Sequence, residues 1–222
     1  MRVVGVADEF APDEAWAKMP VAFLDTETTG TDSRVDRVIE VGIVRGEHGE
    51  IQSHHSWLIH PGMPIPKEST DIHGIKDEDV ADKPSFAEVL PEIIEALRGA
   101  IPAAYNATFD KGFILQEIER AGVRVDDPPP GARKDVTWID PLAFAREFFK
   151  GKGESRALGA VAERLGVSLV NAHRATDDAE AALRVLYALS RDERMPDTYA
   201  ALIQEQRRLM QLQLEAQRFW RK

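Results

Sequence analysis

The sequence contains no cysteine among its 222 residues, which excludes a disulfide framework and fits a reducing compartment such as the cytoplasm. It also lacks an apolar run of the roughly 20 residues that a membrane-spanning helix needs. The first residues turn acidic at Asp8 and Glu9, before the apolar core of a signal peptide has formed. We therefore expect a cytoplasmic protein that does not engage a membrane.

An excess of positive charge is missing as well, because 28 lysines and arginines stand against 38 aspartates and glutamates, a net charge of −10. Tight nonspecific binding to duplex nucleic acid is driven by basic patches, so the composition argues against it. An enzyme that grips a few terminal nucleotides through bound metal ions remains compatible with this charge. The length allows one substantial domain with extensions.

Two neighbouring acids end the first apolar segment of the chain. Asp25 and Glu27 follow residues 21–24 and precede a Thr-Thr-Gly sequence. Because side chains alternate along a strand, both acids point to the same side, where like charges resist joint ionisation unless a cation holds them. Taken alone, the segment fits a metal site and a polar exit from a buried strand about equally.

A third acid, Asp110, opens a segment with helical periodicity. It shares a face with Phe113, Ile114 and Ile118, so it is expected to face the core. The helix dipole explains why an acid is tolerated in a first turn. It does not explain why that acid faces inward.

Periodicity also distinguishes the paired acids Asp177 and Asp178. Asp178 shares a helical face with five apolar residues, namely Ala181, Ala182, Val185, Leu186 and Leu189. Asp177 instead looks like a helix cap with Glu180 behind it, so we choose Asp178 as the inward acid. His173 belongs on the loop before this helix, and its place near an inward aspartate favours a functional role.

In order and character, these three segments resemble the exonuclease motifs of the DEDD superfamily, in its histidine-containing, DnaQ-like (DEDDh) branch. Asp25 and Glu27 match the first motif, Asp110 the second, and His173 with Asp178 the third. Two further segments, residues 72–75 and 82–86, look like the substrate-side segment of the bacterial DNA polymerase III epsilon proofreading subunit.

The resemblance implies a metal-dependent 3′→5′ exonuclease that releases nucleoside 5′-monophosphates from a single-stranded or frayed 3′ end of DNA. Carboxylates are hard donors that suit two Mg²⁺ or Mn²⁺ ions, about 3.5–4 Å apart in such sites. By resemblance, Asp25 bridges the ions and Glu27 and Asp178 complete one of them. Asp110 holds the other, partly through water, and His173 takes a proton from the attacking water.

Further residues are candidates for substrate contacts: Thr28, Thr29, Gly30, His73, Asn106 and Phe109. The first three present hydroxyl and backbone donors, and the glycine permits close backbone approach. His73 and Phe109 offer rings to an unpaired base, while Asn106 either orients the scissile phosphate or ends its strand. Asp140 is left out of the site, because a helix N-cap explains it.

The order of elements fits an α/β, ribonuclease H-like fold with a central mixed sheet flanked by helices and a long C-terminal helix. We expect an N-terminal extension (1–18), an exonuclease domain (19–190) and a C-terminal helical tail (191–222). Strands are expected at residues 21–25, 38–45, 51–58 and 102–105, helices at 86–97, 110–121, 142–149, 157–165, 178–189 and 198–220, and loops at 61–74 and 126–133.

The apolar stripe of the tail helix packs on its own domain or docks on a polymerase or a second copy. We favour association, because Phe219 and Trp220 extend the apolar surface to the end of the sequence. RNA is the alternative substrate, since nothing in the sequence separates it from DNA. A non-catalytic nuclease-fold module that binds a polymerase is less favoured, because a retired site is expected to have lost ligands.

Overall fold

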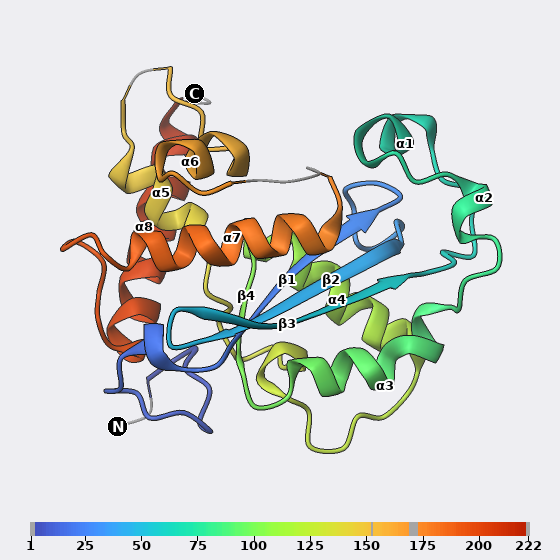
Figure 1. Cartoon of the computed structure of the whole chain (residues 1–222), viewed down its shortest axis with the longest axis horizontal. Helices are drawn as coiled ribbons and strands as arrows, with labels where there is room; N and C mark the ends of the chain where they lie inside the picture. Colours follow the sequence, from blue (N-terminus) through green and yellow to red (C-terminus); the bar gives the residue numbers. More distant parts are fainter. Residues whose placement is uncertain (1–2, 152, 169–172, 221–222) are drawn as a thin grey trace.

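The computed structural model describes residues 3–151, 153–168 and 173–220. Within these residues, four strands form one sheet in the order β3-β2-β1-β4 (Figure 1). The strands are β1 (Val21–Thr28), β2 (Val38–Glu47), β3 (Glu50–Leu58) and β4 (Ile101–Ala103). Because β2 is antiparallel to β1 and β3 while β4 is parallel to β1, the sheet is mixed, as predicted.

Helices cover both faces of the sheet (Figure 1). One face carries α3 (Phe86–Leu97) and α4 (Ala107–Ala121), and the other carries α5 (Pro141–Phe148), α7 (Ala175–Leu189) and α8 (Tyr199–Trp220). The remaining helices are α1 (Lys67–His73), α2 (Asp77–Val80), α6 (Leu158–Arg164) and the 3₁₀ turns η1 (Trp16–Lys18) and η2 (Pro130–Ala132). In the described part of the chain, no helix is long and apolar enough to span a membrane.

β1 carries the first acids, and its burial on both faces decides where they point. Phe23 packs in the core under α7, whereas Leu24 packs in the core under α3 and α4. By the alternation of a strand, Asp25 and Glu27 follow Phe23 toward α7, and Thr26 follows Leu24 toward α4. The end of β1 therefore presents polar groups to both helical layers.

The loop predicted at residues 61–74 is wrong in its second half, because Lys67–His73 form α1. This short helix has no apolar stripe, and His73 is its one buried residue, so periodicity carries no helical signal there. Gly74 ends it in the left-handed region, at φ 75°. Because α1 lies near the end of the sheet that carries the predicted site acids, the error concerns a part of the fold next to the predicted site.

The segment predicted as a surface loop at residues 126–133 is wrong in its packing. Pro130 and Gly131 are buried, and a Cβ on Gly131 would lie 3.1 Å from the side chain of Leu97. The lack of a side chain at Gly131 thus allows η2 to pack directly against α3.

Two helices begin earlier than predicted. α4 starts at Ala107 rather than Asp110, and α7 starts at Ala175 rather than Asp178. The N-cap of α7 is Arg174, so the prediction that Asp177 caps this helix is wrong. Asp177 lies within the first turn instead.

The N-terminal segment around Trp16 and the first half of α8 pack on the central core. Trp16 is buried, and its Nε1 donates to the Pro196 carbonyl at 2.7 Å. The first half of α8 joins the core under α7 through four buried side chains, those of Tyr199, Leu202, Ile203 and Leu209. Leu212 and Leu214 are 48% and 52% exposed, and the side chains of Phe219 and Trp220 lie outside the described residues. A partner-docking surface on α8 is therefore limited to its second half.

We expect a chain that ends at Ser190 to melt about 10 °C or more below the full chain. It loses several buried side chains of α8, each of which stabilises by about 1.5–3 kcal/mol. A chain that ends at Gln213 is the control, because the described side chains that it loses are exposed, and it should melt close to the full chain. Calorimetry checks both, and an unchanged melting temperature for the shorter chain would contradict the packing of α8.

Candidate active site

β1 ends close to the N-terminal end of α7 (Figure 1), and three carboxylates meet there. Asp25 and Glu27 project from β1, and Asp178 projects from the first turn of α7. One oxygen of each lies within 4.8 Å of the corresponding oxygens of the other two, and all three side chains are half-buried. Such a group of hard donors is able to hold a divalent cation.

Asp110 reaches the same strand from the opposite helical layer. It is buried in the first turn of α4, and its Oδ1 accepts hydrogen bonds from Thr26 N at 3.0 Å and Thr26 Oγ1 at 2.8 Å. Thr26 lies between Asp25 and Glu27 in the sequence. The Asp110 carboxylate is therefore fixed to β1 between the positions of the first two acids.

The surroundings of the two acids on β1 oppose their ionisation. Burial raises the pKa of Asp25 well above its usual range, and the charges of Asp110, Glu27, Asp178 and Glu40 raise it further. Burial also raises the pKa of Glu27 to about 8, with Asp178 and Glu40 as the next causes. At neutral pH, these two carboxyls do not both ionise without a compensating charge.

The pKa values of the two acids on the helices, Asp110 and Asp178, are raised as well. Burial raises the pKa of Asp110 to about 7 against the opposing hydrogen bonds from Thr26. Burial likewise raises the pKa of Asp178, against the backbone hydrogen bond and the charge of His173. A divalent cation would relieve the repulsion among all four acids, so the residues present fit the metal that the motifs imply.

His173 stands on the loop that leads into α7, as predicted. Its side chain is exposed, its φ is 71°, and its backbone N donates to Asp178 Oδ2 at 2.8 Å. The bond ties the histidine to the acid of the same motif. The preceding residues Asn171 and Ala172 lie outside the described residues.

The threonine hydroxyls of the turn after β1 form hydrogen bonds within the protein. Thr28 Oγ1 donates to the Gly30 carbonyl at 2.6 Å, and Thr29 Oγ1 accepts from Arg37 N at 2.9 Å. A Cβ on Gly30 would lie 2.4 Å from Asp36 Oδ2, so a side chain at this position would displace the Asp36 carboxylate. The predicted substrate roles of this turn stay predictions, and its hydroxyls have structural partners.

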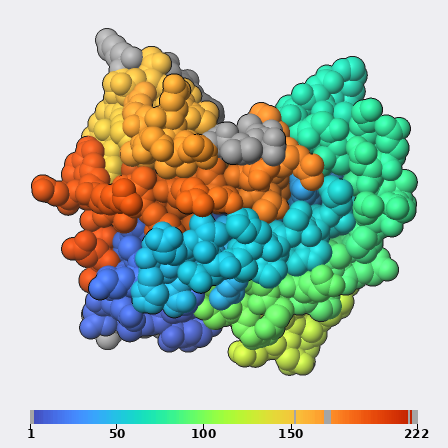
Figure 2. Space-filling view, in the orientation of Figure 1, coloured from blue at the N-terminus to red at the C-terminus, as the bar shows by residue number. Residues whose placement is uncertain are grey.

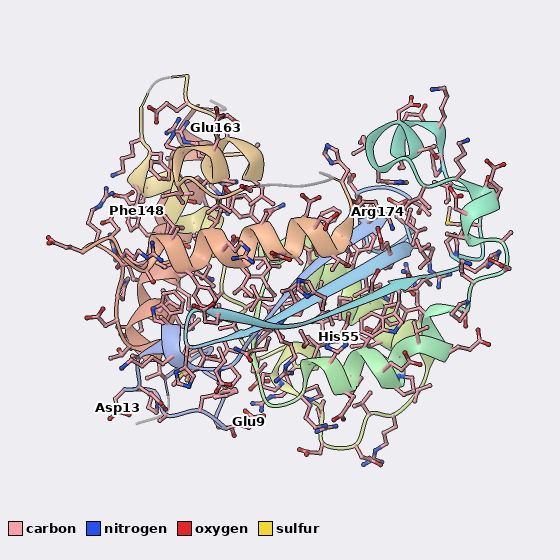
Figure 3. All side chains as sticks on the ribbon, viewed as in Figure 1. Glu9, Asp13, His55, Phe148, Glu163 and Arg174 are labelled. Atoms are coloured by element: carbon pink, nitrogen blue, oxygen red, sulfur yellow. The ribbon has the colours of Figure 1, made fainter. Side chains whose placement is uncertain are left out.

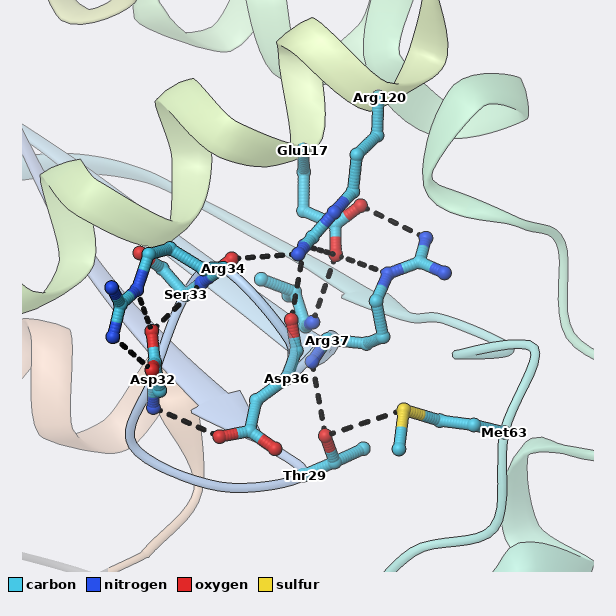
Figure 4. Close-up of polar contacts among 10 residues, drawn as sticks. Thr29, Asp32, Ser33, Arg34, Asp36, Arg37, Met63, Glu117 and Arg120 are labelled. Atoms are coloured by element: carbon cyan, nitrogen blue, oxygen red, sulfur yellow. Dashed lines mark hydrogen bonds and ion pairs between the residues drawn. The ribbon is translucent and has the colours of Figure 1, made fainter.

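A buried ion-pair network fixes residues 29–37 to α4 (Figure 4). Glu117 is 1% exposed and accepts from Arg37 Nε at 2.7 Å and Nη2 at 2.9 Å. Arg120 donates to the carbonyls of Ser33 and Asp36 at 2.7 and 2.9 Å. Sequence analysis missed Glu117, although a glutamate on an inward helical face was a signal for a buried pair.

The remaining substrate candidates, His73, Phe109 and Asn106, lie in different surroundings, and their substrate roles stay predictions. Figure 2 shows a notch between the α1–α2 lobe and the α6 lobe, with the start of α7 at its base. His73 is buried, burial lowers its pKa, and it lines a cavity of about 340 Å³ together with Lys83 and Arg174. Phe109 is half-buried, with its ring 4.9 Å from that of Phe113.

Asp140 caps α5, and it also holds the start of α4. It accepts from Leu142 N at 3.0 Å, from Asn106 N at 3.0 Å and from Ala107 N at 3.2 Å. The reading of Asp140 as a helix cap is thus correct. Asn106 itself is exposed in the left-handed region, at φ 71°, and it is the N-cap residue of α4 rather than the end of β4, which ends at Ala103.

Comparison with known proteins identifies the class and then the family. The fold is ribonuclease H-like: Escherichia coli exonuclease I in complex with a dT13 oligonucleotide superposes with a TM-score of 0.67 at 19% identity, over 78% of this chain and 41% of that chain. Exonuclease X in complex with 5′ overhanging duplex DNA superposes with a TM-score of 0.61 at 23% identity, over 82% of this chain and 98% of that chain. A family model described as RNase T, exonuclease, matches residues 22–186, so the chain belongs to this exonuclease family.

Curated relatives include the PolC-type DNA polymerase III of Thermotoga petrophila, 36% identical over 173 residues, and that of Clostridium perfringens, 35% identical over 162 residues. The matches cover 78% and 73% of this chain, but only 12% and 10% of the polymerases. The chain therefore spans about a tenth of the length of these relatives. The nuclease domain of 3′hExo, described as a DEDDh family member bound to rAMP, superposes with a TM-score of 0.65 at 18% identity, over 79% of this chain and 94% of that chain.

The raised carboxyl pKa values predict how the metal-free protein responds to pH. Their folded-state values exceed the unfolded ones, so the folded state holds more protons and stability falls as pH rises from about 5 toward 8. We expect the melting temperature in EDTA to fall by several degrees over this window. Mn²⁺ should restore it at pH 8.

Glu27→Gln should flatten this dependence, because it removes the carboxyl whose pKa rises to about 8. Glu78→Gln, at a side chain that is 74% exposed, is the control and should keep the wild-type slope. Melting curves from pH 5 to 9 measure both variants. Equal slopes for wild type and Glu27→Gln would show that Glu27 does not titrate in this window.

Proposed function

We propose that the chain is a 3′→5′ exonuclease that hydrolyses the terminal phosphodiester bond of single-stranded or frayed DNA and releases nucleoside 5′-monophosphates. The observation that carries the proposal is the convergence of Asp25, Glu27 and Asp178 within 4.8 Å. Asp110 is hydrogen-bonded to the strand between the first two, and His173 is bonded to the third. A cytoplasmic location is part of the proposal.

Two divalent cations, Mg²⁺ or Mn²⁺, supply charge stabilisation for the attacking and leaving oxygens when bound. Asp25, Glu27 and Asp178, which lie within 4.8 Å of one another, would hold these ions together with Asp110. His173 takes the proton of the attacking water at a ring nitrogen, and its exposure leaves that ring accessible. Its bond to Asp178 keeps the base beside the metal ligands.

DNA is favoured over RNA by the curated relatives, which are DNA polymerases at 36% and 35% identity. RNA remains the second candidate, because a 3′-exonuclease described as recognising the histone mRNA stem-loop superposes with a TM-score of 0.65 at 18% identity. The same relatives support proofreading beside a polymerase, with a stand-alone trimming enzyme as the variant. Nucleotide release from labelled single-stranded DNA and RNA of one sequence distinguishes the substrates.

Metal removal tests the reaction class. Excess EDTA should abolish nucleotide release, and Mg²⁺ or Mn²⁺ should restore it, because the buried carboxylates need a cation to ionise together. Asp25→Asn and Asp178→Asn should each lose nearly all turnover without losing stability, since each removes a repulsive buried charge. Asp177→Asn is the neighbouring control and should keep most activity. Full activity in EDTA, or an essential Asp177, would contradict the proposed site.

Replacement of His173 tests the general base. A general base contributes about 10²–10⁴-fold to rate, so His173→Ala should lower kcat by that order while KM changes much less. Single-turnover measurements on a short labelled strand separate the chemical step from binding. Because the side chain is exposed, the melting temperature should stay close to that of the wild type. Near wild-type turnover would show that the ring takes no part in the reaction.

A further inference from the structure

Glu40 is a buried carboxylate in the interior of β2, directly opposite Glu27 in the strand register. Its exposed fraction is 1%. Like charges opposite each other destabilise a strand pair, so an aliphatic residue would serve the strand better. We propose that Glu40 and Arg174 form a clamp that positions residues 173–178 against the acids of β1, an inference that rests on the proposed function.

Glu40 holds the start of α7 by three contacts. Arg174 Nη2 lies 2.9 Å from Glu40 Oε1 and Arg174 Nε lies 3.3 Å from Oε2. Ala175 N donates to the same Oε2 at 3.3 Å. Arg174 is the N-cap residue of α7 and makes no cap with its own side chain, so Glu40 supplies the cap from β2.

Gly42 allows the start of α7 to pack closely against β2 next to this contact. It lies two residues after Glu40 and therefore on the same face of β2, opposite Asp25 in the register. A Cβ at Gly42 would lie 2.3 Å from the Ala175 carbonyl carbon and 2.4 Å from Thr176 N. The backbone of the first turn of α7 thus rests directly on the backbone of β2.

The segment held in this way carries both functional groups of the third motif. Figure 3 shows Arg174 at the N-terminal end of α7. Asp178 N donates to the Arg174 carbonyl at 3.0 Å, and His173 N donates to Asp178 Oδ2 at 2.8 Å. Because these bonds join His173, Arg174 and Asp178 into one unit, a shift of Arg174 displaces base and ligand together.

A double-mutant cycle tests the clamp. Glu40→Gln and Arg174→Met should each lower kcat at saturating Mn²⁺ by about 10- to 100-fold, since misplacing a catalytic group by about 1 Å costs on the order of 10²-fold. KM for a short DNA strand should change little. The double variant should be no slower than the slower single variant, because both remove the same contact. Arg174→Lys keeps the charge but loses the fork, and should recover part of kcat.

Two outcomes of the cycle would overturn the clamp. Additive losses, with Glu40→Gln the more severe, would make Glu40 a metal ligand in its own right. A raised KM with unchanged kcat in Arg174→Met, and no effect of Glu40→Gln, would make Arg174 a substrate-binding residue. Ile93→Ala on α3 controls for stability, because its side chain is fully buried in the other core. This variant should lower the melting temperature and leave kcat unchanged.

Hydrogen exchange separates failure of the clamp from failure of the proposed function. The amides of residues 173–178 should exchange several-fold faster in Glu40→Gln than in the wild type or in Ile93→Ala, whether or not the protein turns over DNA. Unchanged exchange in Glu40→Gln would overturn the clamp. Absence of metal-dependent nucleotide release by the wild type would overturn the proposed function alone.

Discussion

Repulsion among carboxylates gathered at the end of β1 is the constraint around which this structure is built. Burial and mutual charge raise the pKa of Asp25, Glu27, Asp110 and Asp178, so the metal-free protein holds them at a cost in stability. The fold meets this cost through burial elsewhere, because β1 lies in the core between two helical layers. A bound cation relieves this repulsion, and the relief contributes to the affinity of the site for the cation.

Two ion pairs, each between a buried glutamate and a partly exposed arginine, hold the segments that flank these acids. Glu117 and Arg37 fix the loop after β1 to α4, and Glu40 and Arg174 fix the start of α7 to β2. In each pair, the glutamate is 1% exposed and also accepts a backbone N–H. An ion pair with a solvent-exposed partner contributes little net stability. In this structure the two pairs position the segments that they join.

The sequence sufficed where the signal was local. Strand alternation placed Asp25 and Glu27 on one side, and helical periodicity selected Asp178, which the structure places in the acid cluster. It failed where the determining partner lies far along the chain. The cap of α7 was assigned to Asp177, but it comes from Glu40, 135 residues before the amide that it accepts from. Similarly, α1 was missed because it has no apolar stripe, and its Ser69 Oγ donates to the Thr29 carbonyl, 40 residues earlier in the chain.

The tail helix shows the same dependence on distant partners, because it reaches the site through hydrogen bonds. Gln206 is 1% exposed, its Oε1 accepts from Asp140 N at 2.7 Å, and its Nε2 donates to the Trp138 carbonyl at 2.9 Å. The Asp140 carboxylate in turn accepts from the first amide of α4, the helix that carries Asp110. An apolar stripe in the sequence predicts burial but not the surface that covers it. Here the first half of the stripe is covered by the domain itself, so the tail helps to orient α4, whereas Leu212 and Leu214 beyond it are about half exposed.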